Sequence, residues 1–269
     1  TILVAGKERL LQFDPTRGVF ASLPTDTRAN RLRFLGPLND RSVCVQRLSA
    51  HPGTESLRLE IFDGTHFQAL PVTPPFATIG ATVLAVFQSR NGDLWLGGDR
   101  SVACYREGQW RDFTTAPTAP EGAWCFAEAA DGRIWCATTD QVWEFNGRHW
   151  SILRTGFETI HALSSGREGA LWIAANNGLH RFVQDYWLEI SAPEGLPESP
   201  VFSLLEDRRG QLWVGTSQGL SRQHPEADLD PPRTEISTLT TKPIEAGGAI
   251  TLDFRGRDKW KFTPQNRLL

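Results

Sequence analysis

Apolar and polar positions recur along this chain with a period of about 40 residues. Four times a Gly stands three residues before a Trp, an aliphatic residue directly before it, and another aliphatic residue seven residues after it. The four tryptophans are Trp95, Trp135, Trp172 and Trp213, which lie 40, 37 and 41 residues apart. A repeat of this length that keeps several columns in phase indicates one structural unit used many times.

Two weaker copies precede these four. Leu3 takes the place of the Trp in the first copy. Leu59, Phe62 and Phe67 close the second copy, whose front half is displaced by an insertion near His51. Six repeats are therefore visible, four of them well kept and two degraded.

Each repeat reads as a set of short strands. β-rich residues fill the segment twelve to seven residues before each Trp, and turn pairs such as Asn91-Gly92 separate it from the Trp strand. A third strand holds the aliphatic residue at plus seven, and a further turn leads into a fourth strand. No segment has sustained helical periodicity. The segments before each Trp are 83–88, 123–128, 160–165 and 201–206.

A single four-stranded sheet cannot bury both of its faces, whereas sheets stacked radially cover one another. We therefore predict an all-β fold in which residues 1–226 form a β-propeller of four-stranded antiparallel blades, with six repeats visible and six or seven blades in total. The small residue two positions after each Trp is expected to admit an aromatic side chain of the neighbouring blade. These residues are Gly97, Ala137, Ala174 and Gly215.

Composition agrees with this fold and excludes some functions. The chain has 269 residues, of which 40% are apolar, and a formal net charge of −3, so it has no electrostatic footprint for nucleic acid. No apolar run approaches the length of about 20 residues that spans a bilayer, and we find no signal peptide. Because the chain contains no Met and opens inside a strand pattern, it resembles an excised or processed piece.

The sequence contains no constellation that indicates catalysis. Its six histidines include no pair at metal-ligand spacing, and nucleophile elbows, phosphate loops and dinucleotide fingerprints are missing. Glu128, Glu206 and Asp207 lie at the ends of inner strands, where a general acid could stand, but charges in hairpin turns explain them more simply. We therefore predict no catalytic residues, no cofactor and no metal.

Two of the four cysteines are expected to lie nearly opposite each other. Cys125 comes ten residues before Trp135 and Cys136 one residue after it, so the hairpin between them brings the two strands together. Whether they form a disulfide or are two small buried residues stays open at this point, because the geometry of cross-strand bridges is restricted.

The last repeat resembles a known family. The segment from Leu205 to Arg222 reads LEDRRGQLWVGTSQGLSR, which is similar to the repeat of the two-component regulator propeller family. The segment 174–181 keeps most of that pattern, and residues 195–197 read GLP, which often precedes the next inner strand of the family. The earlier repeats keep the Trp frame and lose the GTxxGL part.

A second resemblance follows the last repeat. Residues 230–236, DPPRTEI, and 252–264, LDFRGRDKWKFTP, are similar to the start of the immunoglobulin-like domain that joins such propellers to a membrane helix. We expect residues 227–269 to form a truncated immunoglobulin-like linker domain, because too few strands are present for a complete sandwich.

These resemblances imply an extracytoplasmic, periplasmic sensory region of a bacterial sensor histidine kinase or diguanylate cyclase. Such a propeller binds a small molecule or a saccharide, is not an enzyme, and meets the membrane only through segments outside this chain. The alternative is a scaffold for protein interaction or dimerisation, with a homodimer as one of its forms. A lyase or glycosidase is a third and weaker alternative, because propellers host many functions.

The column eleven residues before each Trp carries the most specific prediction for a site. It holds Leu84, Trp124, His161 and Phe202, and variation among large and polar residues suits a channel mouth better than a uniform core. We predict that Trp124, His161 and Phe202 bind the ligand, with polar help from residues of neighbouring loops. The alternative is packing between blades for the large residues and solvation for the loop residues. The loop residues are Asp99, Arg100, Asp140, Asn176 and Asn177.

Overall fold

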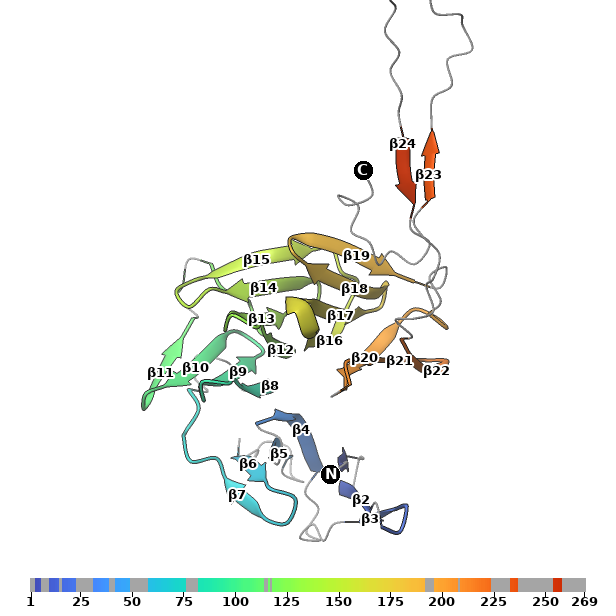
Figure 1. The fold of residues 1–269 in the computed structure, drawn as a ribbon. Coiled ribbons are helices and arrows are strands. Elements are labelled where there is room, and N and C mark those ends of the chain that lie inside the picture. The colour runs from blue at the N-terminus through green and yellow to red at the C-terminus, as the bar shows by residue number, and fades with distance from the viewer. Residues whose placement is uncertain are drawn as a thin grey trace, which may run out of the picture. The chain divides into compact units, whose positions relative to one another are not determined.

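The computed structural model describes most of the chain as antiparallel sheets (Figure 1). Two compact units, Thr1–Gly156 and Phe157–Leu269, make up the chain, and each is described by itself below. Among the described residues the helical content is one 3-10 turn, η1 (Arg167–Gly169). The described residues are 3–5, 10–14, 16–22, 31–38, 42–48, 58–75, 82–113, 116, 118–191, 196–207, 209–223, 233–236 and 254–257.

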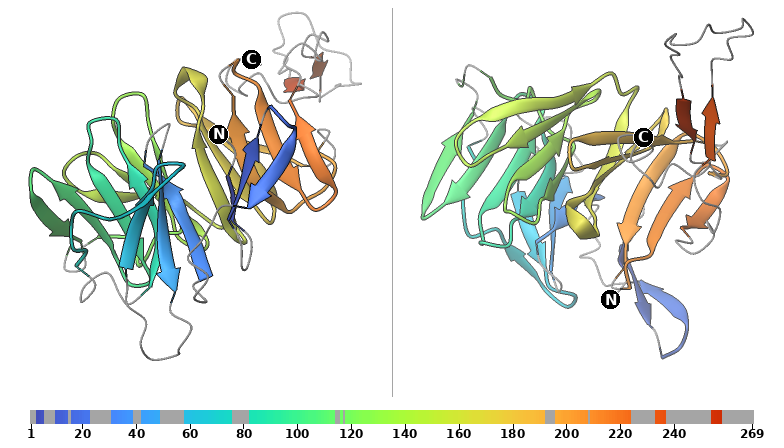
Figure 2. Two further views of the ribbon diagram at one scale, coloured as in Figure 1. Left: turned by 90° about the horizontal axis from the view of Figure 1, so that it is seen from below. Right: turned by 45° about the horizontal axis from the view of Figure 1, so that its top comes forward.

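The first unit contains three four-stranded antiparallel sheets and one three-stranded sheet. The innermost strands of successive four-stranded sheets contact each other, β4 with β8 and β8 with β12 (Figure 2). The three-stranded sheet is β1 (Leu3–Ala5), β2 (Leu10–Asp14) and β3 (Val19–Ser22). The four-stranded sheets are β4 (Arg31–Pro37), β5 (Val43–Leu48), β6 (Arg58–Phe62) and β7 (Phe67–Ala69), then β8 (Val83–Gln88), β9 (Leu94–Gly98), β10 (Val102–Arg106) and β11 (Gln109–Asp112), then β12 (Cys125–Glu128), β13 (Ile134–Ala137), β14 (Gln141–Phe145) and β15 (Trp150–Thr155).

The second unit contains one four-stranded, one three-stranded and one two-stranded sheet. The innermost strands of the two larger sheets, β16 and β20, contact each other. The four-stranded sheet is β16 (Ile160–Ser165), β17 (Leu171–Ala175), β18 (Gly178–Val183) and β19 (Tyr186–Ile190). The smaller sheets are β20 (Val201–Glu206), β21 (Leu212–Thr216) and β22 (Gly219–Arg222), and the hairpin of β23 (Arg233–Ile236) and β24 (Phe254–Arg257).

The prediction of an all-β propeller with four-stranded antiparallel blades is confirmed, but the predicted number of blades is wrong. The described residues form five blades, not six or seven, namely the four four-stranded sheets and the sheet β20–β22. The first repeat, around Leu3, gives only the sheet β1–β3. Every residue of β3 is exposed.

The four repeated tryptophans, which we call the Trp ladder, mark the packing of the blades, as their spacing predicts. Trp95 and Trp135 are 1% exposed and Trp172 is 5% exposed. Trp95 packs edge-on against Phe145 and Trp150 of the following blade, with ring centroids 5.2 and 5.7 Å away. Such edge-to-face contacts add to the free energy gained from burying the apolar surface of the rings.

The small residue two positions after the Trp has a different role from the one predicted. A Cβ on Gly97 would lie 2.3 Å from the carbonyl oxygen of Ala123 and 2.8 Å from its Cβ. Gly97 therefore admits the backbone of the next blade just before its innermost strand, and not an aromatic ring. A Cβ on Gly215 would meet the hydroxyl of Ser203 in its own blade at 2.3 Å.

The predicted juxtaposition of two cysteines is wrong by one residue. Cys125 pairs with Ala137, and Cys136 pairs with Phe126. Because successive side chains of a strand point to opposite faces, this register places Cys125 and Cys136 on opposite faces of the sheet. None of the four cysteines forms a disulfide.

The immunoglobulin-like prediction lies largely outside the described residues. Of residues 227–269, the structure describes the strands β23 and β24, which pair with Arg233 opposite Arg257 and Ile236 opposite Phe254. An antiparallel hairpin agrees with many β folds, so the linker domain stays a prediction. Among the residues with a described placement, none lies in a helix with the length and apolar character needed to cross a bilayer.

Candidate functional site

The column eleven residues before the Trp coincides with a kink in the innermost strands. The pairing of β8 with β9, of β16 with β17 and of β20 with β21 skips one residue, and the skipped residues are Leu84, His161 and Phe202. The same column in the blade β12–β15 holds Trp124, directly before β12. The backbone N–H of Trp124 donates to the carbonyl of Ala137. Bulges turn a side chain out of the regular alternation of a strand, so this column has a geometry of its own.

In the second unit the bulges bring three of the predicted residues together. The His161 ring lies 5.1 Å from the Phe202 ring, centroid to centroid. The Nε2 of His161 is 2.8 Å from Oδ1 of Asn176, and this pair joins the innermost strand β16 to the end of β17. Phe202 is 45% exposed and His161 and Asn176 are half-buried, so a ligand can reach all three side chains.

The backbone fixes this cluster, which we call the bulge cluster (His161, Asn176 and Phe202). The N–H of Asn176 donates to the carbonyl of Thr159 at 3.0 Å, which ties the hairpin tip to the segment before β16. The adjacent Asn177 faces elsewhere, because its Oδ1 lies 3.1 Å from Nε2 of the buried His180. Asn177 is therefore a partner of a core histidine and not a member of the cluster.

The other predicted residues lie in the first unit. Trp124 is 49% exposed. Because Trp side chains are highly buried on average, this exposure makes Trp124 a candidate for contact with a ligand. The segment that leads to it packs against the β9–β10 turn, since the N–H of Ala123 donates to the carbonyl of Gly98 at 3.2 Å. Asp99 and Arg100 are exposed in that same turn, whereas Asp140 is exposed in the β13–β14 turn.

Phe34 is a candidate that the sequence pattern did not predict. It lies on β4 next to the bulge of that strand, and 46% of it is exposed. The second repeat has no Trp, so its innermost strand could not be aligned with the others. In the sequence, an aromatic residue on an expected innermost strand would have been the only signal for Phe34.

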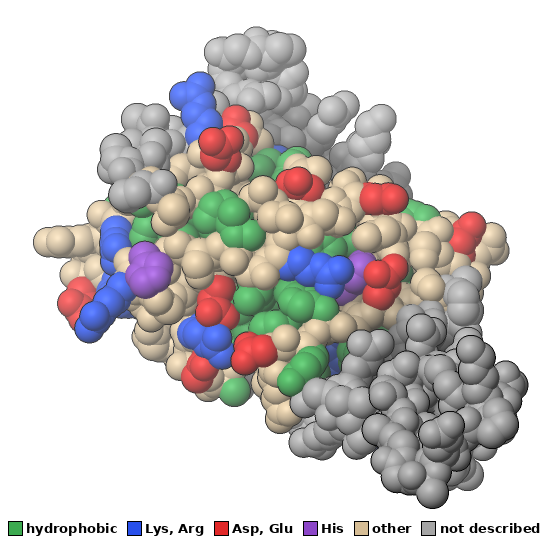
Figure 3. All heavy atoms as spheres, turned by 90° about the horizontal axis from the view of Figure 1, so that it is seen from above, with side chains coloured by type: hydrophobic (Ala, Val, Ile, Leu, Met, Phe, Trp, Pro, Cys, Tyr) green, Lys and Arg blue, Asp and Glu red, His purple; other side chains and the backbone are tan. Residues whose placement is uncertain are grey.

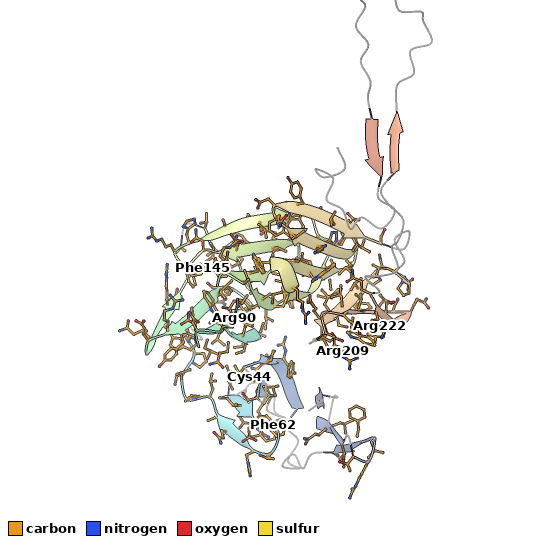
Figure 4. The ribbon with its side chains drawn as sticks, viewed as in Figure 1. Cys44, Phe62, Arg90, Phe145, Arg209 and Arg222 are labelled. Atoms are coloured by element: carbon orange, nitrogen blue, oxygen red, sulfur yellow. The ribbon has the colours of Figure 1, made fainter. Side chains whose placement is uncertain are left out.

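Two of the inner-strand carboxylates, Glu128 and Glu206, link neighbouring blades. Glu128 accepts a hydrogen bond from the backbone N–H of Arg90 at 2.8 Å, and Glu206 does the same for Arg167 (Arg90 is labelled in Figure 4). Both guanidinium groups also lie within 3.5 Å of these carboxylates. The side chain of Asp207 accepts from the Trp213 indole at 3.1 Å, and this bond lowers the pKa of Asp207. The simpler interpretation of these residues as turn groups is supported.

Figure 3 shows acidic and basic side chains interspersed with hydrophobic ones over the face that it presents. A surface of this kind suits a neutral or weakly charged ligand better than a polyanion.

Comparison of sequences identifies the class of repeat. Residues 195–218 match the model of the two component regulator propeller family. The chain therefore carries a repeat of that family at the place where the sequence pattern is clearest. Comparison with curated proteins found no sequence match.

Solved structures with a similar fold include extracellular domains of one and two component systems and a lyase. The extracellular domain of a one component system from B. thetaiotaomicron matches with a TM-score of 0.64 at 13% identity, over 82% of this chain and 30% of that one. A hybrid two component system of the same organism matches with a TM-score of 0.61 at 15% identity, over 91% and 35%. Virginiamycin B lyase from Staphylococcus aureus matches with 0.51 at 16%, over 74% and 76%.

These likenesses establish the propeller fold. The chain spans about a third of the length of the two extracellular domains. The functions of those proteins are their own and enter only as support for the proposal below.

Proposed function

We propose that this chain is a ligand-sensing propeller from the extracytoplasmic part of a bacterial signal-transduction receptor, and that it is not itself an enzyme. The two component regulator propeller repeat at residues 195–218 supports the class of receptor. The similar folds of extracellular domains of one and two component systems support a periplasmic or extracytoplasmic location.

The observation that carries the ligand-binding part of the proposal is the bulge cluster. It combines an exposed aromatic face, Phe202, with the imidazole of His161 and the amide of Asn176. An apolar face beside groups that donate and accept hydrogen bonds matches a saccharide or a small polar molecule with both CH and OH or NH groups. Trp124, with Asp99, Arg100 and Asp140, is the corresponding set in the first unit.

A panel of saccharides and amino acids, screened by thermal shift, tests this proposal. We expect one ligand class to raise the melting temperature of the wild type, because a ligand that binds only the folded state stabilises it by mass action. The increase should disappear in Phe202→Ala and in His161→Ala. A panel without any response would contradict ligand sensing.

An interaction scaffold is the second candidate, and one observation favours it. On the last blade, Leu205 and Leu220 are 61% and 68% exposed, and Phe202 of the same blade is exposed as well. Exposed apolar side chains of this size are typical of surfaces that bind another protein, including a second copy of the chain. Sedimentation at several concentrations separates the two candidates, since only the scaffold requires self-association or a protein partner.

A further inference from the structure

The blade β8–β11 has a pocket on the side that faces the next blade, β12–β15. Its volume is about 320 Å³, and its walls are formed by two groups of side chains. The aromatic group is Trp95, Trp110, Phe113 and Phe145, and the polar group is Cys104, Arg106, Glu107, Gln109 and Arg111. The size lies near the lower end of the range that holds small ligands.

The strand register explains why these side chains share one wall. Cys104 lies opposite Trp95 on one side and opposite Arg111 on the other. Arg106 comes two residues after Cys104 on the same strand and lies opposite Gln109. Because side chains two residues apart on a strand share a face, these five side chains lie on the same face of the sheet. Phe145 comes from β14 of the neighbouring blade and closes the opposite side (Phe145 is labelled in Figure 4).

The indole of Trp95 has no acceptor. Trp95 is 1% exposed, and its Nε1 has no hydrogen-bond partner among the described residues. A buried donor without a partner costs free energy, and native proteins rarely leave one in that state.

Two tryptophans at the equivalent position of other blades have an acceptor for the indole N–H. The indole of Trp135 donates to Oε2 of Glu144 at 2.9 Å, and the indole of Trp213 donates to Oδ2 of Asp207 at 3.1 Å. Glu144 lies opposite Trp135 in the ladder, and the residue in that place opposite Trp95 is Cys104. The blade β8–β11 therefore has no carboxylate in the place that Glu144 occupies in the next blade.

The remaining groups favour an anion with an apolar body. Arg111 lies over the Phe113 and Phe145 rings, at 4.8 and 5.7 Å, and donates to the carbonyl of Arg148. Arg106 is already paired with Asp93, and Glu107 is an exposed acid at the rim. The pocket thus offers a free indole N–H and a guanidinium beside aromatic walls.

From these contacts we infer that the pocket between the blades β8–β11 and β12–β15 is a second ligand site, which binds the carboxylate of a small aromatic acid. The ligand carboxylate accepts from Trp95 Nε1 in the place that Glu144 occupies in the next blade, and Arg111 supplies the opposite charge. The aromatic body lies against Phe113 and Phe145. This site does not depend on the bulge cluster.

Phenylacetate and its neutral analogue phenylacetamide are the probes that test this inference. We expect saturable binding of phenylacetate by calorimetry and at least tenfold weaker binding of the amide, because the amide lacks the charge that Arg111 meets. In ¹⁵N-labelled protein, the indole N–H signal that disappears in Trp95→Phe should move when phenylacetate is added to the wild type.

Two variants complete the test. Arg111→Gln should weaken binding at least tenfold, whereas Arg209→Gln, the same change at an exposed arginine of the second unit, should leave it unchanged. Cys104→Glu should abolish binding by supplying the missing carboxylate from within. No saturable binding to the wild type, or an unmoved Trp95 signal at saturation, would overturn the inference even if a variant failed to fold.

Discussion

Glu206 accepts hydrogen bonds from the backbone N–H of Arg167, a residue 39 positions earlier in the chain, at 3.1 and 3.2 Å. A carboxylate at the end of one innermost strand therefore caps the turn of the preceding blade. Glu128 and Arg90 form the same link in the first unit. These links turn two residues that resembled candidate acids into parts of the framework.

Replacing Glu206 by Ala should lower the free energy of unfolding by about 1–3 kcal/mol, because the turn loses an ionised acceptor. Urea unfolding measures this difference. The exposed Glu158→Gln should change stability by less than about 0.5 kcal/mol and serves as the control. A loss for Glu206→Ala no larger than that of the control would show that the link contributes nothing.

Gly97→Ala should destabilise the chain by about 1–3 kcal/mol or more, since the new Cβ would stand 2.3 Å from a backbone oxygen that cannot turn away. Thermal unfolding checks this. Ala130→Ser also adds one heavy atom, at an exposed position of the next blade, and should be nearly neutral. Equal melting temperatures for the two variants would contradict the close approach of the blades at Gly97.

Three of the four thiols should be silent toward a disulfide reagent at pH 8 in the native protein. Burial raises the pKa of Cys44 and of Cys104 to about 12 and the pKa of Cys136 well above its ordinary value, so little reactive thiolate forms. Denatured protein without reductant should titrate four thiols. Two thiols under those conditions would reveal a disulfide and contradict the register of β12 with β13.

Asp63 gives a prediction for acid stability. Hydrogen bonds from the backbone N–H groups of His66 and Thr65 lower its pKa from 3.8 to about 2. Because the folded pKa lies below the unfolded one, its contribution is complete above the unfolded pKa and is lost as the pH falls from about 4 to 2. Asp63→Asn should therefore lose less stability than the wild type between pH 5 and pH 2, and an identical loss in both would contradict this.

Much of the fold follows from the Trp ladder. The predicted segments 83–88, 160–165 and 201–206 coincide with β8, β16 and β20. The remaining segment, 123–128, begins two residues later than predicted, because β12 starts at Cys125. The chain kinks at Trp124 before regular pairing begins. Apolar pattern fixes which residues form strands, whereas a kink depends on backbone geometry that the pattern does not contain.

The register of β12 with β13 and the number of blades could not be predicted from the sequence, for similar reasons. The one-residue difference between the pairs Cys125–Ala137 and Cys125–Cys136 depends on the turn conformation at residues 129–133. The first repeat kept the periodic pattern around Leu3 but gave only a three-stranded sheet. Of the predicted site, His161, Asn176 and Phe202 meet, whereas Asn177 turns to His180, a difference between adjacent amides that no pattern resolves.

The affinity of Phe202→Ala for the ligand found in the panel tests the central claim most directly. Calorimetry should show at least tenfold weaker binding than in the wild type, because the aromatic wall of the bulge cluster is lost. Leu205→Ala, on the same strand and more exposed, should stay within twofold of the wild type. Equal affinities for all three proteins would contradict ligand binding at the bulge cluster.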